Sequence, residues 1–329
     1  MERPGTSQFV TLPARAAHLP NQSPICHSKS TERFAAMQTL VLALLLAGVL
    51  SFFSRAVQEW VRTGFHRRPA LIWIVPFILT GIFGAAAFLA NACSWPLSAL
   101  VFVYTAMPVS CAALQGAGSI KRPTAMDFAT ILLLWLPLEL AAGGSLVPRP
   151  AQGYLHSVAY GIAILLGLLL FLGFRSFPDL KYNLPHTKRD WWLPLAGFAA
   201  AAPVLILVGV AIGFIPPPHW PGKSGGAMTA AAGVIFVGTA LPEEILFRSL
   251  IQNLLMLRFG AGMRTLLMAS FTFGGAHLNN GPQPLPNLRY MILATIAGFA
   301  YGRVFQRAST VLSSAALHSL VDWTKHFFF

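Results

Sequence analysis

Long apolar segments recur along the whole chain, and they constrain the fold more than any other feature of the sequence. Runs of about 18 or more apolar residues are long enough to cross the hydrocarbon core of a bilayer as helices. With 55% hydrophobic and only 10% charged residues, the chain cannot cover a soluble domain of its length with polar side chains. We therefore predict an all-α fold, a polytopic transmembrane helical bundle of about eight to ten membrane helices, with spans near 35–55, 69–91, 95–115, 125–147, 155–174, 191–215, 227–250, 262–280, 289–306 and 309–328.

The net charge of +13 is explained by the distribution of basic residues between loops. Alternate loops are rich in Lys and Arg, whereas the loops between them carry only Arg149 or Lys223. This is the positive-inside pattern of a membrane protein, and it argues against nucleic acid as a partner. It predicts a multi-pass protein of a bacterial inner or plasma membrane, in contact with membrane lipid, whose cytoplasmic loops hold Arg55, Arg62, Arg67, Arg68, Lys121, Arg122, Arg175, Lys181, Lys188, Arg189, Arg258, Arg264, Arg303 and Arg307.

Composition divides the chain into three parts. Residues 1–34 are polar and lack a helical period, so we predict a disordered tail on the outer side; one hypothesis is that translation begins at Met37. Residues 35–190 hold transmembrane helices of unknown role, and residues 191–329 form a second transmembrane domain. The three cysteines (Cys26, Cys93 and Cys111) have no metal-type spacing and predict no disulfide framework.

Ionisable side chains inside predicted spans are rare in this chain. Such residues are costly in a membrane and indicate function by default. Asp127 is the exception, because it stands at a span entrance where it can cap the helix. The others are Glu139 in the fourth span and, within the last ninety or so residues, Glu243, Glu244, Arg248, His277, His318 and Asp322.

The segment TALPEEILFRSL places two adjacent glutamates in an apolar helix. Glu244 and Arg248 are four residues apart and so face each other across one turn, which predicts a salt bridge. Glu243 lies about 100° away on the helix and has no such partner. Pro242 predicts a kink or a helix restart, so we expect Glu243 at the edge of a polar cavity.

Two further pairs repeat the four-residue spacing, Phe273 with His277 and His318 with Asp322. A carboxylate and an imidazole that converge on one water form a general-base arrangement, and a second histidine can donate to an oxyanion. This set predicts a hydrolase in which Glu243 and His277 activate water. A metal version stays open, with a divalent ion such as zinc on Glu243, His277 and His318.

The motifs EExxxR, FxxxH and HxxxD, in this order on successive helices, resemble those of the CPBP (CAAX protease and bacteriocin-processing) family of intramembrane proteases, including the CAAX prenyl endopeptidases. Gly298 and Gly302, which also form a GxxxG helix-packing motif, add to the likeness across about residues 226–325.

The resemblance implies an eight-helix-like core that opens to the cytoplasmic side and a catalytic domain over residues 191–329. It further implies that Glu243 and His277 activate water, that His318 and Asp322 form the oxyanion site, and that Glu244 and Arg248 support them. The family commonly has asparagine where Asp322 stands, so the role of this aspartate is an open question.

Other functions remain open from the sequence. Buried Glu, Arg, His and Asp also describe a proton-coupled transporter, which would give Glu139 a role. A catalytically silent scaffold or immunity protein is a third alternative. GKSG at Gly222–Gly225 matches a rhomboid protease motif with Ser224 as nucleophile, but a Pro/Gly-rich loop would contain these residues anyway. The substrate, expected to be a membrane-associated protein or peptide, could be a prenylated CAAX protein or a bacteriocin leader.

Overall fold

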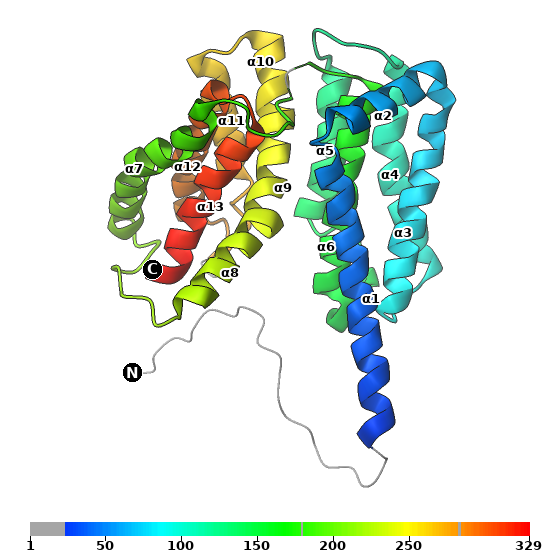
Figure 1. The fold of residues 1–329 in the computed structure, drawn as a ribbon, viewed down its shortest axis with the longest axis horizontal. Helices are drawn as coiled ribbons and strands as arrows, with labels where there is room; N and C mark the ends of the chain where they lie inside the picture. Colours follow the sequence, from blue (N-terminus) through cyan, green and yellow to red (C-terminus); the bar gives the residue numbers. More distant parts are fainter. Residues whose placement is uncertain (1–23, 179, 282–283) are drawn as a thin grey trace.

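A computed structural model describes residues 24–178, 180–281 and 284–329, and for residues 24–32 the backbone alone. Throughout this part of the chain the regular structure is helical and contains no strand, as the sequence predicts. The helices form two groups that stand side by side, α1–α6 and α7–α13 (Figure 1).

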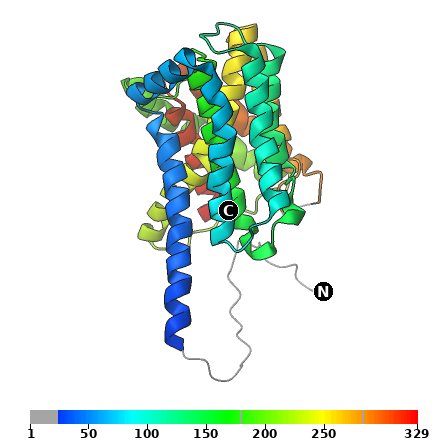
Figure 2. The same cartoon turned by 90° about the vertical axis from the view of Figure 1, so that its right-hand side faces the viewer.

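The first group holds six α-helices. Helix α1 begins at Pro24, inside the segment predicted to be a tail, and its first turns project beyond the neighbouring helices (Figure 1, Figure 2). Residues 1–23 of the predicted tail lie outside the described residues. The helices are α1 (Pro24–Ser51), α2 (Arg55–Arg67), α3 (Val75–Leu89), α4 (Trp95–Gln115), α5 (Ala125–Glu139) and α6 (Gln152–Leu168), which a π-helical segment, η4 (Leu169–Phe174), extends.

The second group contains the residues singled out for chemistry. A single continuous helix runs through α8 to α10 and carries EExxxR, while the other motifs lie on α11 and α13. The elements are α7 (Lys188–Ala211), α8 (Gly225–Ile235), η5 (Phe236–Ala240), α9 (Leu241–Glu244), η6 (Ile245–Gln252), α10 (Asn253–Phe259), α11 (Met263–Gly275), α12 (Leu288–Arg307) and α13 (Val311–Phe328).

Six helical segments of the described chain are long and apolar enough to cross a bilayer, which makes this a multi-pass membrane protein: Arg33–Ser51, Pro69–Leu89, Trp95–Gln115, Arg149–Phe174, Lys188–Ala211 and Gly225–Phe259. The remaining predicted spans correspond to α5 and α11, which are shorter than expected at 15 and 13 residues, and to α12 and α13. Four exposed tryptophans lie toward the two ends of the helices: Trp60 within the short helix α2 and Trp191 in the first turn of α7 on the basic side, and Trp95 at the start of α4 and Trp220 in the connection after α7 on the other side. Such aromatic belts mark the two interfaces of a bilayer.

The helix bends between α8 and α10, over the stretch that contains Pro242, which agrees with the predicted kink (Figure 1). The helix neither breaks nor restarts; instead, π-helical segments η5 and η6 lie on both sides of α9. A π-helical turn is wider than an α-helical one, so it accommodates the proline ring and the missing N–H without ending the helix. The two adjacent glutamates therefore sit between two irregular turns, a feature that often accompanies function.

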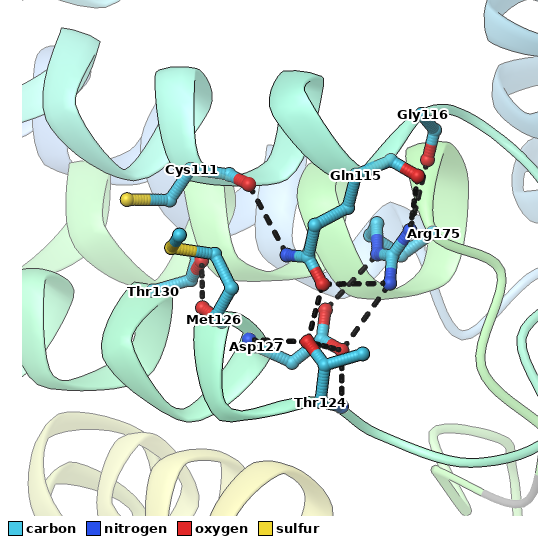
Figure 3. Close-up of polar contacts among 8 residues, drawn as sticks. All are labelled: Cys111, Gln115, Gly116, Thr124, Met126, Asp127, Thr130 and Arg175. Atoms are coloured by element: carbon cyan, nitrogen blue, oxygen red, sulfur yellow. Dashed lines mark hydrogen bonds and ion pairs between the residues drawn. The ribbon is translucent and has the colours of Figure 1, made fainter.

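A buried ion pair fixes the basic end of the first group (Figure 3). The Arg175 Nε donates to Asp127 Oδ1 at 3.0 Å, and Arg175 Nη1 donates to the carbonyl of Gly116 at 2.9 Å. Asp127 also caps α5, as predicted, through a reciprocal pair of hydrogen bonds with Thr124. The guanidinium thus joins the end of α6 to the end of α4 and the start of α5.

At the corresponding end of the second group, hydrogen bonds hold the start of α13 against α7. Asp190 accepts hydrogen bonds from the backbone N–H and the hydroxyl of Ser309, at 2.7 and 2.6 Å. In the connection before α7, Lys181 Nζ donates to the carbonyls of Phe305 and Ala308 at the end of α12. These contacts set the start of α13, two turns before His318.

The GxxxG prediction is confirmed by close helix packing. A Cβ atom at Gly298 would come 3.0 Å from Phe273 Cδ1, and one at Gly302 would come 2.6 Å from Gln252 Oε1. At the crossing of α11 and α12, a Cβ atom at Gly274 would come 2.7 Å from the carbonyl oxygen of Met291. The absence of side chains at these glycines lets α12 approach the helices that carry the first two motifs.

Candidate active site

Glu244 lies at the centre of a buried polar cluster. Its Oε2 accepts a hydrogen bond from Arg248 Nε at 3.1 Å, and its Oε1 lies 3.2 Å from His318 Nδ1. The side chains of Glu244 and Arg248 are wholly buried. The predicted pairing of Glu244 with Arg248 is present, and the structure adds a second partner from α13.

Arg248 is held by more than this carboxylate. Its Nη1 donates to Gln252 Oε1 at 3.4 Å, and its guanidinium carbon lies 5.0 Å from the centre of the Phe273 ring. Gln252 Nε2 donates in turn to the carbonyl of Gly302 at 2.9 Å. The three side chains, four residues apart, form a buried ladder from α9 to α12, so the charge of Glu244 is compensated and its position is fixed.

His318 is oriented from three sides. Glu244 holds Nδ1, and Tyr301 stacks on the ring with a centroid distance of 4.5 Å. On the opposite side, His318 Nε2 lies 3.3 Å from Asp322 Oδ2 and 3.9 Å from Glu243 Oε2. A short contact between a ring nitrogen and a carboxylate oxygen requires a proton between the two atoms. Both ring nitrogens of His318 make such a contact, so both act as hydrogen-bond donors.

His277 presents the opposite arrangement. Its Nδ1 lies 2.8 Å from the carbonyl oxygen of Phe273, which can only accept, so the proton is on Nδ1. Nε2 of the neutral ring is then an acceptor. Tyr290 packs against the ring edge-on at 4.5 Å and Phe273 lies 4.7 Å away, so aromatic contacts fix its orientation.

Glu243 differs from its neighbour in having an unsatisfied oxygen. Its side chain is 24% exposed, yet Oε2 is buried and makes no hydrogen bond with any described residue. A buried carboxylate oxygen without a donor is costly unless water or a substrate supplies one. The expectation that Glu243 is the carboxylate without a local partner therefore agrees with the geometry.

A cavity of about 110 Å³ joins these side chains. A cavity of this size has room for more than one water molecule. Helix α7 contributes part of the wall through Phe198 and Leu205, and the cavity extends to Phe214 and Ile215 in the connection after α7. The predicted residues that line it are Glu243, His277, His318 and Asp322.

Glu243 also lines a second cavity, of about 490 Å³, between the two helix groups. Its other walls come from α1 and α6, including Leu45, His156 and Tyr160. Nearer the basic end the groups touch, where Trp135 packs edge-on against Phe247 at 5.4 Å. Glu243 is thus accessible both from the cavity inside the second group and from the space between the groups.

The three residues considered for zinc, Glu243, His277 and His318, line one cavity without forming a group that could hold a metal ion. Among the described residues, no three His, Cys, Asp or Glu side chains are grouped closely enough to hold a metal ion. The chemistry of the donor set agrees with this, because both ring nitrogens of His318 face carboxylates and neither offers a lone pair. The side chains as they lie therefore fit water activation without a resident metal.

Two sequence features outside the cluster have local structural roles. Ser224 is the N-cap of α8, where its hydroxyl accepts from the N–H of Ala227 at 3.3 Å. Glu139, at the end of α5, accepts from the indole N–H of Trp135 at 3.1 Å and is not among the residues lining the first cavity. Neither joins the candidate site.

Sequence reasoning missed three residues that build the site, Gln252, Tyr290 and Tyr301, and one contact between residues that it had singled out. Gln252 could have been found, because it continues the four-residue spacing of Glu244 and Arg248. The contact between Glu244 and His318 crosses from α9 to α13, and no local spacing shows it. Tyr290 and Tyr301 carry no motif, and their roles depend on how α12 packs.

The fold and the cluster together define a class: a multi-pass helical membrane protein with a cavity among its helices that carboxylates and imidazoles line. A comparison with protein-family models places part of the chain within that class. Residues 225–324 match the family described as type II CAAX prenyl endopeptidase Rce1-like. The chain therefore carries a domain of this protease family, as the resemblance of its motifs implied. Comparisons of the chain with curated proteins and with solved structures gave no match.

Proposed function

We propose that the protein is an intramembrane endopeptidase in which Glu243 and His277 activate a water molecule. The observation that carries the proposal is the pair of acceptors on one cavity. Glu243 Oε2 is buried without a donor, and His277 exposes Nε2 because Phe273 holds its other nitrogen. A water that donates to both groups would be oriented and made more nucleophilic at once.

The proposed reaction needs no covalent intermediate. Water attacks the carbonyl carbon of the scissile peptide bond while one of its protons passes to Glu243. The carbonyl oxygen becomes an oxyanion, and the Nε2–H of His318 is the donor that faces the cavity beside Glu243. The tetrahedral intermediate collapses when the proton held by Glu243 passes to the departing amine.

Glu244 and Arg248 support this chemistry through His318. Glu244 accepts from Nδ1, which directs Nε2 into the cavity, and Arg248 neutralises the carboxylate that does so. Asp322 is placed to hold the same Nε2 before substrate binds. An oxyanion would have to displace this carboxylate, and we infer that Asp322 orients His318 in the resting state and does not contact the transition state.

We further propose that the catalytic domain spans residues 191–329. The family match begins at Gly225, yet α7 supplies Phe198 and Leu205 to the cavity wall. The cavity between the helix groups gives substrate a path from the bilayer to Glu243, which fits a membrane-associated peptide such as a prenylated CAAX sequence or a leader. A bacterial inner or plasma membrane is the proposed location.

Purified protein in lipid vesicles, offered a prenylated CAAX peptide and a set of membrane-protein substrates, tests the proposal. We expect peptide-bond cleavage by the unaltered protein and its loss in Glu243→Ala and in His277→Ala. A Glu139→Ala variant is the matched control, because it removes a carboxylate within the predicted fourth span that does not line the first cavity. Cleavage that persists in Glu243→Ala would exclude Glu243 as the base.

A further inference from the structure

The two ends of the second helix group differ in charge. At the end where α7 starts and α10 finishes, the helix termini and connections carry six basic residues: Lys188, Arg189, Arg258, Arg264, Arg303 and Arg307. The opposite end, where α8 and α12 start, carries Lys223, Arg289 and Lys325. The first group repeats this asymmetry, with the loops around α2, before α5 and after η4 basic at the same end of the molecule (Figure 1).

The candidate cavity extends toward the end that is poor in charge. Its outermost walls are Phe214 and Ile215, which follow the last residues of α7, and Phe329, which ends α13. The connection after α7 lies over this end, because His219 N–H donates to the carbonyl of Phe328 at 2.9 Å. His277 lies just beyond the final turn of α11, at the same end.

We propose that the active-site cavity faces the extracytoplasmic side of the membrane, and that the substrate is a peptide segment on that side. Lys and Arg are retained on the cytoplasmic side of membrane proteins, so the basic end is the inner one. The cavity then opens outward, which differs from the cytoplasmic opening that the family resemblance implied. The part of this inference that concerns the substrate rests on the proposed function. The part that concerns the side of the membrane rests on the charge distribution and on the geometry of the cavity.

The orientation narrows the substrate class. A protein that is prenylated in the cytosol presents its modified carboxyl terminus at the inner face, away from this cavity. The chemistry that fits is an extracytoplasmic peptide stretch next to a membrane span, as in an exported or membrane protein. The cavity beside α1 and α6, of about 490 Å³, has room for only a few residues of such a substrate, and its wall on α1, which includes Leu45, is apolar.

Cysteine labelling in intact cells tests the sidedness without reference to activity. In a variant lacking the three native cysteines, Gly222→Cys marks the cavity end and Ala261→Cys marks the basic end; both positions are exposed and uncharged. A membrane-impermeant maleimide should label Gly222→Cys at least tenfold more than Ala261→Cys, and the two equally after lysis. Stronger labelling of Ala261→Cys, or equal labelling in intact cells, would overturn the proposal.

A pair of reporters tests the substrate class. Each is a single-span protein carrying the same peptide stretch, on the extracytoplasmic flank in one and on the cytoplasmic flank in the other. We expect cleavage of the first reporter alone, and its loss in Glu243→Gln. Cleavage of the cytoplasmic flank would overturn the assigned substrate side. Absence of cleavage at both flanks would remove the proposed substrate class and count against the proposed function, while the labelling result would still decide which way the cavity faces.

Discussion

Replacing Arg248 by methionine should destabilise the protein far more than any loss of a surface charge. In the unaltered protein the side chains of Glu244 and Arg248 are both wholly buried. The substitution therefore removes the guanidinium and leaves the Glu244 carboxylate buried. Breaking a buried ion pair by removing one partner costs about 3–5 kcal/mol, and here Glu244 would keep its contact with His318 Nδ1 at 3.2 Å. The contact of the guanidinium with the Phe273 ring at 5.0 Å is lost as well.

The chain offers a matched control for this experiment. Arg62 and Glu59 are 3.3 Å apart, but their side chains are 35% and 66% exposed, so Arg62→Met should cost between about 0 and 1 kcal/mol. Glu244→Gln combined with Arg248→Met removes both charges and keeps an acceptor for His318, so the double variant should recover most of the lost stability. Unfolding by denaturant in mixed micelles, followed by tryptophan fluorescence, measures the three free energies. Equal losses for Arg248→Met and Arg62→Met would refute the claim that this pair is buried and compensating.

Three further variants separate the roles of neighbouring residues. Asp322→Asn keeps an acceptor for His318 without the negative charge, so kcat/KM in the cleavage assay should stay within about tenfold of the unaltered protein, or about 1.4 kcal/mol; a loss of a hundredfold would show that the charge is needed. Gly302→Ala should cost about 1–3 kcal/mol in a denaturant titration, since its Cβ would come 2.6 Å from Gln252 Oε1, and an unchanged midpoint would contradict the tight packing. Ser224→Ala should leave cleavage unchanged and lower the free energy of unfolding by about 1 kcal/mol through loss of the α8 cap, whereas loss of cleavage with stability intact would restore the serine hypothesis.

The helical membrane fold could be predicted because the bilayer imposes it. An apolar run long enough to cross the membrane has few alternatives to a helix, so the segments at 69–91 and 95–115 were placed within a few residues of the helices observed. Within the predicted span at 125–147, the helix ends at Glu139 after 15 residues. The apolar residues that follow Glu139 lie in loops and 3₁₀ turns, so the apolar run is longer than the helix.

Local spacing predicted those parts of the site that lie on one helix. The pairing of Glu244 with Arg248 and the contact of His318 with Asp322 follow from one helical turn, and both are present. The π-helical form of the helix around Pro242 could not be predicted in the same way. A proline in a long helix is compatible with a kink, a restart or a π-helical turn, and neighbouring packing selects among them.

Contacts between different helices could not be predicted from the sequence. The approach of His318 to Glu244 depends on the register of α13 against α9, which Asp190 and Ser309 set more than two turns away. The end of the molecule toward which the cavity extends could not be predicted from the sequence either. The charge pattern indicated which loops are cytoplasmic, but only the packing of α7 and α13 shows toward which end the cavity extends.

The central claim is that Glu243 activates the attacking water. Its most direct test is the ratio of kcat/KM between the unaltered protein and Glu243→Gln, measured on one cleaved substrate in lipid vesicles. Removing a general base should lower kcat/KM by about 10²–10⁴-fold while the unfolding midpoint is retained, and Glu139→Gln should stay within about twofold of the unaltered protein. A Glu243→Gln variant that cleaves as fast as Glu139→Gln would contradict the claim.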